Sequence, residues 1–317
     1  MFLGIEIGGT KLQLGVGPGD GATFTEFVRL DVDTARGGAG IRDQIAAVGP
    51  ELVRKHGVKR VGYGFGGPVF GAKGIVQTSH QVAGWDQFPL VEWTQQQLGV
   101  PTRLGNDCDV AALAEATYGA GRQARTVFYV TVGTGIGGGL VIDKKIHGTD
   151  RPAAAEIGHL RPGLDATTAH HTVESRAAGP AISARVQRRL QELAAAKQVT
   201  DLAQQLLNLV DGNVEQLTTK QIAIAAAQGN EFALESYREA TTVLGWAIAQ
   251  MTTLLAPDVV IIGGGVSLVG DDVFFNPLRE SVDKYSFPPL RGQCPVVPAA
   301  LGESVVVHGA LALAAAE

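Results

Sequence analysis

The sequence has few cysteines, few aromatic residues and no strong excess of charge of either sign. Its 317 residues include two cysteines, Cys108 and Cys294, and 6% aromatic residues. Two cysteines are too few for a disulfide framework or a cysteine-rich zinc cluster, so we expect a protein of the reducing cytoplasm. The net charge is −5 and no basic block is present, which argues against nucleic acid as a partner.

A leader and a long hydrophobic run are also missing from this sequence. Glu6 interrupts the first apolar run and no basic segment precedes it, so we expect no signal peptide. The apolar run from Val305 to Ala316 contains His308 and is too short to cross a bilayer. We therefore expect no membrane partner. With 45% hydrophobic and 18% charged residues, the chain is long enough for two folded domains.

Glycine is what the sequence has in excess. It accounts for 42 residues, about twice the usual share in proteins. The stretch from Phe128 to Asp143, FYVTVGTGIGGGLVID, predicts a strand, a glycine turn and a returning strand. Backbone N–H groups can converge at such a turn, and Thr134 adds a hydroxyl, which together suit phosphate oxygens. A plain glycine-rich hairpin is the alternative interpretation.

A second hairpin of the same design begins the chain. The apolar run from Phe2 to Ile7 leads into the turn from Gly8 to Lys11, GGTK, and Leu12 to Val16 returns. The stretches from Val58 to Gly67 and from Pro257 to Gly265 form another matching pair, each a strand and a glycine turn that follow an amphipathic helix. Such repeated units predict a mixed α/β protein of two related lobes with a cleft between them.

Helical spacing and β-rich runs predict the elements between these turns. Gly57 is placed to cap the first helix, and Pro257 is placed to end the longest one. That longest helix has heptad-like spacing, but we prefer a core helix packed on a sheet to a coiled coil. Helices are expected over residues 41–53, 90–98, 110–115, 180–197, 218–228, 231–256 and 305–316, and strands over 23–30 and 102–104.

Asn106 and Asp107 stand between a short strand and a strongly helical run. Either side chain can cap the helix that follows. A carboxylate at the carboxyl end of a strand also faces the crevice in which open α/β sheets bind ligands. The two interpretations are compatible.

Glu156 and His159 are three residues apart. On a helix they would share one face and could bind a metal ion. Such a site needs further ligands, for which Asp165, His170 and His171 are the candidates. A sugar-binding or structural polar cluster is the alternative that we prefer.

Taken in order, five motifs resemble the ROK family of sugar kinases and repressors, which belongs to the actin, Hsp70 and hexokinase fold. The resemblance covers nearly the whole chain and implies two ribonuclease H-like lobes that close over a hexose and Mg-ATP. It further implies a small lobe of residues 1–117 completed by a helix at 304–317, a large lobe of residues 118–303, and a homodimer. The motifs are Gly4 to Lys11, Asn106-Asp107, Thr131 to Gly139, Glu156 to His159 and Val259 to Gly265.

The resemblance also implies roles for individual residues. Asp107 is similar to the base that accepts the proton of the attacking sugar hydroxyl, and an aspartate is ionised at neutral pH. Phosphoryl transfer depends mainly on positioning and charge neutralisation. The nucleotide-binding positions are Gly8, Gly9, Thr10, Lys11, Gly133, Thr134, Gly135, Gly263, Gly264 and Gly265. The sugar-binding positions are Asn106, Glu156, His159, Glu174, Gly67 and Gln81.

Three features depart from the family pattern. Glu6 stands where the first phosphate motif usually has Asp, which keeps the charge for a water-mediated Mg²⁺ contact but adds one methylene. Asp165, Thr167 and Thr172 stand in the places of three zinc-binding cysteines. Because hard oxygen ligands replace thiolates poorly, we predict no structural zinc. Gln81 replaces a family asparagine, which bears on the choice of sugar.

The leading prediction is an ATP-dependent hexose kinase that acts on the 6-hydroxyl, first of all a glucokinase. Kinases of N-acetylhexosamines, mannose or fructose are alternatives, and so is polyphosphate as the donor. A sugar-sensing repressor of the family would carry a helix-turn-helix ahead of the phosphate motif, and here that motif starts at residue 4. We therefore place this regulator second, and a non-catalytic sugar or nucleotide binder third.

Overall fold

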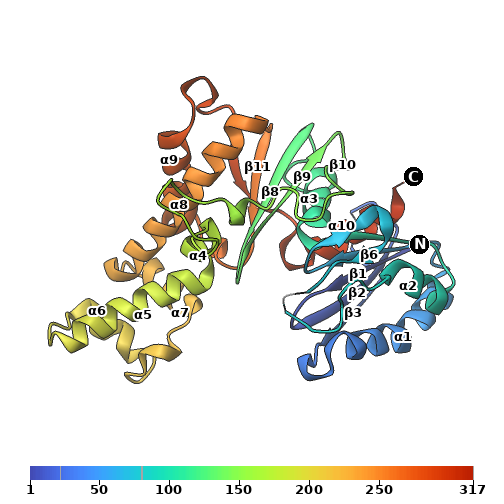
Figure 1. Cartoon of the computed structure of the whole chain (residues 1–317), viewed down its shortest axis with the longest axis horizontal. Coiled ribbons are helices and arrows are strands. Elements are labelled where there is room, and N and C mark those ends of the chain that lie inside the picture. The colour runs from blue at the N-terminus through green and yellow to red at the C-terminus, as the bar shows by residue number, and fades with distance from the viewer. Residues whose placement is uncertain (22, 80, 317) are drawn as a thin grey trace. The chain divides into compact units, whose positions relative to one another are not determined.

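A computed structural model describes residues 1–21, 23–79 and 81–316 (Figure 1). Contacts divide the chain into two compact units. The first unit comprises Met1–Tyr129, Gly138–Ala155 and Ala299–Glu317, and the second comprises Val130–Gly137 and Glu156–Pro298. The functional lobe boundaries given above stay a prediction. Within the described residues, no helix has the length and apolarity needed to cross a membrane.

The first five-stranded sheet has the order β3-β2-β1-β4-β7. β1 (Phe2–Ile7), β2 (Lys11–Gly17) and β3 (Glu26–Asp31) form an antiparallel meander. β4 (Val61–Phe65) pairs parallel with β1, and β7 (Thr102–Asn106) pairs parallel with β4. The N-terminal hairpin and the strand after the first helix are therefore confirmed.

The second five-stranded sheet has the order β10-β9-β8-β11-β12. β10 pairs antiparallel with β9, and β11 pairs parallel with β12. A meander followed by crossover strands thus occurs twice, as the paired hairpins and glycine turns predict. The strands are β8 (Thr126–Val132), β9 (Ile136–Ile142), β10 (Lys145–Ile146), β11 (Val259–Gly263) and β12 (Val296–Pro298), and a separate pair consists of β5 (Val69–Phe70) and β6 (Ile75–Val76).

Among the residues that the structure describes, the first unit contains four α-helices. α1 ends at Gly57, whose φ of 59° and ψ of 46° are the left-handed cap conformation that the sequence predicts. Asn106 caps α3 with its side chain, so the capping prediction is also confirmed. The helices are α1 (Gly37–His56), α2 (Leu90–Leu98), α3 (Asp107–Thr117) and α10 (Val305–Ala315).

Helix α10 packs closely on β1, β4 and α3 (Figure 1). A Cβ atom on Gly62 of β4 would lie 1.9 Å from the carbonyl oxygen of Ala310, and one on Gly309 would lie 1.8 Å from that of Val110. Glycine is required at both positions because any side chain would separate the helix from the sheet or from α3. The opposite face of the sheet carries a core that includes Leu3, Ile5, Leu12, Leu14, Tyr63 and Phe65, all at most 1% exposed.

The second unit contains six α-helices over the described part of the chain. The long helix α8 packs against α4, α5, α7 and α9 and buries Tyr237, Leu244 and Met251. A core helix is therefore confirmed over a coiled coil. The helix ends at Leu255, and its capping residue Ala256 is followed by Pro257, which prevents continuation. The helices are α4 (Val173–Ala177), α5 (Gly179–Ala195), α6 (Asp201–Asn208), α7 (Thr219–Ala227), α8 (Glu231–Leu255) and α9 (Asn276–Tyr285).

Candidate functional site

The parallel strands of the first sheet bring three loops to one edge. In the register of the sheet, Ile7 lies opposite Phe65, and Phe65 lies opposite Asn106. The turns that follow β1, β4 and β7 therefore leave the sheet side by side. They carry the first glycine turn, Gly67 and Asp107, so one edge gathers most of the residues predicted in this unit.

The first glycine turn, Gly8 to Thr10, is bracketed by an ion pair. The N–H of Gly8 donates to the carbonyl oxygen of Lys11 at 3.0 Å, which closes the turn. The Lys11 Nζ lies 3.2 Å from the Glu6 Oε1 on the neighbouring strand. A cation and backbone N–H groups at one turn are the features that a phosphate group binds.

Glu6 is a buried carboxylate with one oxygen to spare. It is 7% exposed, and its Oε2 has no hydrogen-bond partner among the residues that the structure describes. Burial raises the pKa of Glu6, Lys11 opposes that shift, and the charge of Asp107 adds to it. Mg²⁺ takes oxygen ligands and is usually held by one or two carboxylates together with phosphate oxygens and water. The spare oxygen therefore fits a Mg²⁺ contact.

Asp107 is the first residue of α3, directly after the capping residue. The Asn106 side-chain oxygen accepts from the N–H of Cys108 at 2.8 Å, and its Nδ2 donates to the carbonyl oxygen of Gly67 at 2.9 Å. The Cys108 N–H also donates to the Asp107 Oδ1 at 2.8 Å. Burial raises the pKa of the Asp107 carboxyl, and the bonds from Cys108 oppose part of that shift. A fixed carboxylate with a raised pKa has the properties of a general base.

Gln81 lies against the first glycine turn. A Cβ atom built on Gly9 would be 2.0 Å from the Gln81 Oε1 and 3.1 Å from its Cβ. The side chain that the family resemblance assigns to the sugar therefore contacts the turn assigned to the nucleotide. Thr10, the third residue of the turn, is exposed.

The second glycine turn, Gly133 to Gly135, is held by backbone hydrogen bonds. Within the turn, the N–H of Gly133 donates to the carbonyl oxygen of Gly135 at 2.9 Å. The carbonyl oxygen of Gly133 accepts from the N–H of Gly179 at 2.8 Å, which joins the turn to the start of α5. Thr134 at the tip is exposed, so its side chain is open to solvent.

The third glycine stretch, Gly263 to Gly265, packs on the strand that leads into the second turn. Gly264 has a φ of 90°, and a Cβ there would be 2.4 Å from the carbonyl oxygen of Val132. The N–H of Val266 donates to the same oxygen at 3.0 Å. Gly265 has nothing within 4 Å of a built Cβ, so it faces open space.

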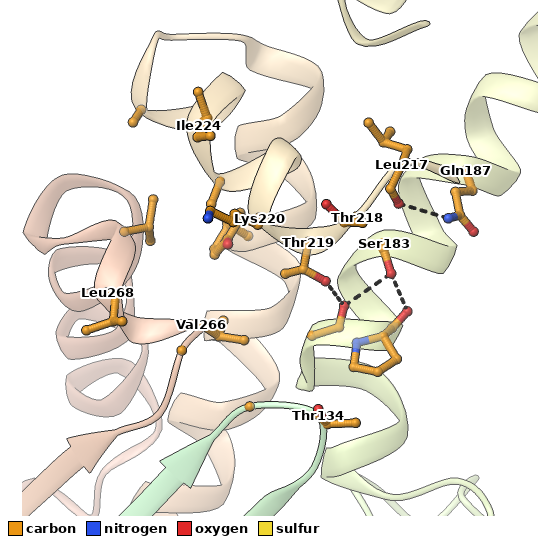
Figure 2. A pocket seen from close by; sticks show the side chains of 18 of the residues that line it. Thr134, Ser183, Gln187, Leu217, Thr218, Thr219, Lys220, Ile224, Val266 and Leu268 are labelled. Atoms are coloured by element: carbon orange, nitrogen blue, oxygen red, sulfur yellow. Dashed lines mark hydrogen bonds between the residues drawn. The ribbon is translucent and has the colours of Figure 1, made fainter. Parts of the chain in front are cut away.

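A pocket of about 1070 Å³ lies in the second unit where these two stretches meet α5 and α7 (Figure 2). Three of the residues assigned to the nucleotide, Gly133, Thr134 and Gly265, line this pocket together. Gly263 and Gly264 directly precede Gly265 in the chain. The other walls include Gly179, Pro180, Ser183, Gln187, Thr218, Thr219, Lys220, Ile224, Val266 and Leu268.

The walls of this pocket combine exposed apolar side chains with hydroxyl and amide groups and with the charged side chains of Lys220 and Glu215. Ile224 is 49% exposed and Leu268 is 78% exposed. Figure 2 shows Lys220 and Ile224 on α7 across from Leu268 and Val266, with Thr134 at the foot of the pocket. The Thr219 hydroxyl donates to the carbonyl oxygen of Gly179 at 2.6 Å, which ties α7 to α5. Such a lining suits a flat, mostly apolar ring carrying a few polar atoms.

Sequence reasoning missed the walls from α5 and α7. The local signals were present, because Gly179-Pro180 begins a helix and Thr218 forms a capping box with Gln221. These signals predict helix starts, however, and carry no information about which turn a helix start will meet. The bond from Gly179 to Gly133, which assembles the pocket, is a tertiary contact.

Glu156 and His159 lie on a single 3₁₀ turn, η3 (Ile157–His159), with Glu156 as its capping residue. The α-helix on which the metal-binding alternative depended is therefore not formed at these residues. The reason is the close packing of Gly158, where a Cβ would be 2.0 Å from the carbonyl oxygen of Ile136. His159 is exposed and Glu156 is half-buried.

Glu174, the remaining predicted sugar contact, is held at the first turn of α4. Its Oε2 accepts the N–H of Ile136, the residue after the second glycine turn, at 2.7 Å. Thr172, one of the residues in the places of the family's cysteines, caps α4 through a capping box with Ser175. Over the described ranges, no three His, Cys, Asp or Glu side chains lie close enough to hold a metal ion by themselves. The absence of zinc stays a prediction.

Comparison with known proteins shows similarity along the whole chain. Residues 2–317 match the ROK family. The chain is 32% identical to a glucokinase of Streptomyces coelicolor over 99% of its length and 97% of that protein, and 30% identical to a glucokinase of Thermotoga maritima over 98% and 96%. A solved glucokinase of Streptomyces griseus in complex with glucose and AMPPNP is 31% identical, with a TM-score of 0.79 over 99% of this chain and 98% of that one.

Proposed function

Because the chain belongs to the ROK family and has the actin/hexokinase-type fold of ROK sugar kinases, we propose that it is an ATP-dependent hexose kinase. More specifically, we propose a glucokinase that transfers the γ-phosphoryl group of ATP to the 6-hydroxyl of glucose. This proposal depends most on one observation, namely that the partly buried carboxylate of Asp107 has a raised pKa and lies beside the first glycine turn. Similarity to bacterial glucokinases at about 30% identity supports the same activity.

Asp107 is the proposed base. In this role it accepts the proton of the sugar 6-hydroxyl as that oxygen attacks phosphorus. The bond from the Cys108 N–H to Oδ1 leaves Oδ2 for the hydroxyl. Burial keeps the pKa of Asp107 above its ordinary value, so the ionised carboxylate is a stronger base than an exposed aspartate.

The first unit supplies charge for the phosphates in this proposal. The turn from Gly8 to Thr10 offers backbone N–H groups, and Lys11 offers an ammonium group that now pairs with Glu6. Glu6 would hold Mg²⁺ through its spare oxygen. When bound, Mg²⁺ neutralises the charge of the transferring phosphoryl group.

The second unit holds the nucleotide in this proposal. Gly133, Thr134 and Gly135 bind phosphate oxygens, and the pocket beside Gly263 to Gly265 takes the adenosine. The exposed faces of Ile224 and Leu268 support a nucleotide donor over polyphosphate, because a chain of phosphates has no apolar group to bury there.

The remaining assignments are part of the same proposal. The sugar contacts are Asn106, Glu156, His159, Glu174, Gly67 and Gln81. The proposed protein works in the cytoplasm as a homodimer of two-lobed subunits. Among sugars, mannose, fructose and N-acetylhexosamines compete with glucose, since Gln81 stands where the family has asparagine.

A coupled assay of ADP release with Mg-ATP over hexoses, hexosamines and ketoses tests the proposal. We expect the highest kcat/KM with glucose. A higher value with mannose, fructose or an N-acetylhexosamine would correct the substrate but keep the kinase. If no sugar releases ADP above the rate with water, the enzymatic proposal is wrong and a non-catalytic binder takes its place.

A further inference from the structure

Ile136 connects the second glycine turn with the segments that are assigned to the sugar. Ile136 directly follows Gly135 and is 2% exposed. Its N–H donates to the Glu174 Oε2 at 2.7 Å. Its carbonyl oxygen would lie 2.0 Å from a Cβ atom on Gly158, so the backbone of η3 packs directly on it. Both backbone groups of this residue are therefore in contact with sugar-assigned segments.

The carboxylate of Glu174 is held in place over the turn. The N–H of Val173 donates to the carbonyl oxygen of Leu160 at 2.8 Å, which joins α4 to the end of η3. The capping box of Thr172 and Ser175 fixes the first turn of α4, on which Glu174 lies. A Cβ atom on Gly135 would be 2.7 Å from the Glu174 Oε2, so the carboxylate covers the turn at close range.

We propose that Glu174 is a positioning residue for the nucleotide as well as a contact for the sugar. By accepting the N–H of Ile136, it fixes the second glycine turn, and it couples the filling of the sugar site to the shape of the phosphate site. This inference rests on the proposed function, which assigns Glu174 to the sugar and the turn to the phosphates.

The chemistry of a carboxylate permits both tasks. An ionised carboxylate accepts about four hydrogen bonds on its two oxygens. One of them is taken by Ile136, which leaves the others for sugar hydroxyls. Hydrogen bonds to an ionised acceptor are also stronger than neutral ones. Because coupling between two ligands is reciprocal, sugar should raise the affinity for nucleotide by the factor by which nucleotide raises the affinity for sugar.

Binding of AMPPNP to the sugar-free protein, measured by calorimetry, tests this role without turnover. Glu174→Ala should weaken AMPPNP binding about tenfold, since a charge-assisted hydrogen bond to the turn is lost. Glu174→Gln keeps an oxygen that can accept the Ile136 N–H, so its affinity should stay within about threefold of the wild type. His159→Ala is the matched control, since His159 is assigned to the sugar and no hydrogen bond joins it to the turn within the described residues; its AMPPNP affinity should not change.

A second variant keeps the test valid if Glu174→Ala fails to fold. Gly135→Ala places a Cβ against the Glu174 Oε2 and should weaken AMPPNP binding, although it removes no side chain that is assigned to the sugar. If Glu174→Ala and Gly135→Ala both bind AMPPNP within twofold of the wild type, or if His159→Ala loses as much affinity as Glu174→Ala, the positioning role is wrong. A wild-type protein that binds AMPPNP but phosphorylates no sugar would instead contradict the proposed function alone.

Discussion

The two glycine turns share one design but are held in different ways. The first, Gly8 to Thr10, is surrounded by side chains, namely the Glu6–Lys11 ion pair and Gln81. The second, Gly133 to Gly135, is held by the backbone N–H of Gly179 and by the Glu174 carboxylate. Of these two similar turns, the first is therefore stabilised by charged side chains, and the second is stabilised mainly by contacts of its backbone.

This difference has a consequence for ligand binding. The Lys11 side chain is 29% exposed and can turn toward a phosphate group. Because the Glu6 carboxylate is buried, this exchange is favourable only when another cation, such as Mg²⁺, takes the place of Lys11 beside it. The second turn has less freedom, since Gly264 lies so close to the strand before this turn that a Cβ atom there would be 2.4 Å from the Val132 oxygen. We infer that the first turn adapts to charge and that the second provides a preformed shape.

The largest expected effect is a loss of kcat from a substitution in the first unit that leaves nucleotide binding by the second unit unchanged. Asp107→Asn keeps an oxygen that can accept the Cys108 N–H but removes the proton acceptor. We expect kcat to fall about a thousandfold, as for the loss of a general base, and AMPPNP affinity to remain unchanged. Coupled ADP release and calorimetry measure the two quantities. A kcat within tenfold of the wild type would remove Asp107 from its role.

The next effect tests the backbone frame of the second turn. Gly264→Ala introduces a side chain at a φ of 90° and 2.4 Å from the Val132 oxygen, so we expect the free energy of unfolding to fall by about 3 kcal/mol. Gly133→Ala is the control, because a Cβ there has nothing within 4 Å and should change it by less than about 1 kcal/mol. Urea unfolding measures both. Equal losses would show that the frame is not rigid at Gly264.

A smaller effect is expected at the first turn, where a side chain can move aside. Gly9→Ala meets the end of Gln81, and we expect a loss of about 1 kcal/mol in stability. Gln81→Ala should remove most of that loss in the double variant, because the two residues are in contact. Urea unfolding of the four proteins gives the coupling. Strict additivity would contradict the contact between Gln81 and the turn.

The smallest expected effect is a dependence on pH. Burial raises the folded-state pKa of Asp107 above 3.8, so the folded protein binds the proton more tightly than the unfolded chain. The stability that comes from protonated Asp107 is therefore fully present below the pKa of the unfolded chain, and it is lost as pH rises through the raised pKa of the folded protein. As pH rises between these two pKa values, the stability of Asp107→Asn relative to the wild type should increase. As pH falls through the same range, kcat of the wild type should decrease. A stability difference that is independent of pH would show that the pKa is not raised.

The sequence predicts those parts of the fold that have strong local signals. The helix expected at residues 90–98 has those bounds in the structure, and Gly57 and Asn106 cap the helices that they were expected to cap. Short elements such as α4, with 5 residues, carry too little periodicity to be recognised. The helix α9 was also missed.

The candidate site is harder to predict because it depends on contacts between distant residues. The bond from Ile136 to Glu174 joins positions 38 apart in the sequence, and no local pattern indicates it. The pocket wall formed by α5 and α7 depends on the Gly133–Gly179 bond in the same way. Family resemblance supplied the residue types, whereas the hydrogen bonds that orient them come from the structure alone.

Phosphorus NMR of a mixture of glucose, Mg-ATP and the protein tests the central claim most directly. We predict that the wild type converts the γ-phosphate signal of ATP into the signal of glucose 6-phosphate, and that Asp107→Asn leaves ATP intact over the same time. The appearance of free phosphate without a sugar phosphate, or equal sugar phosphorylation by the two proteins, would contradict the account.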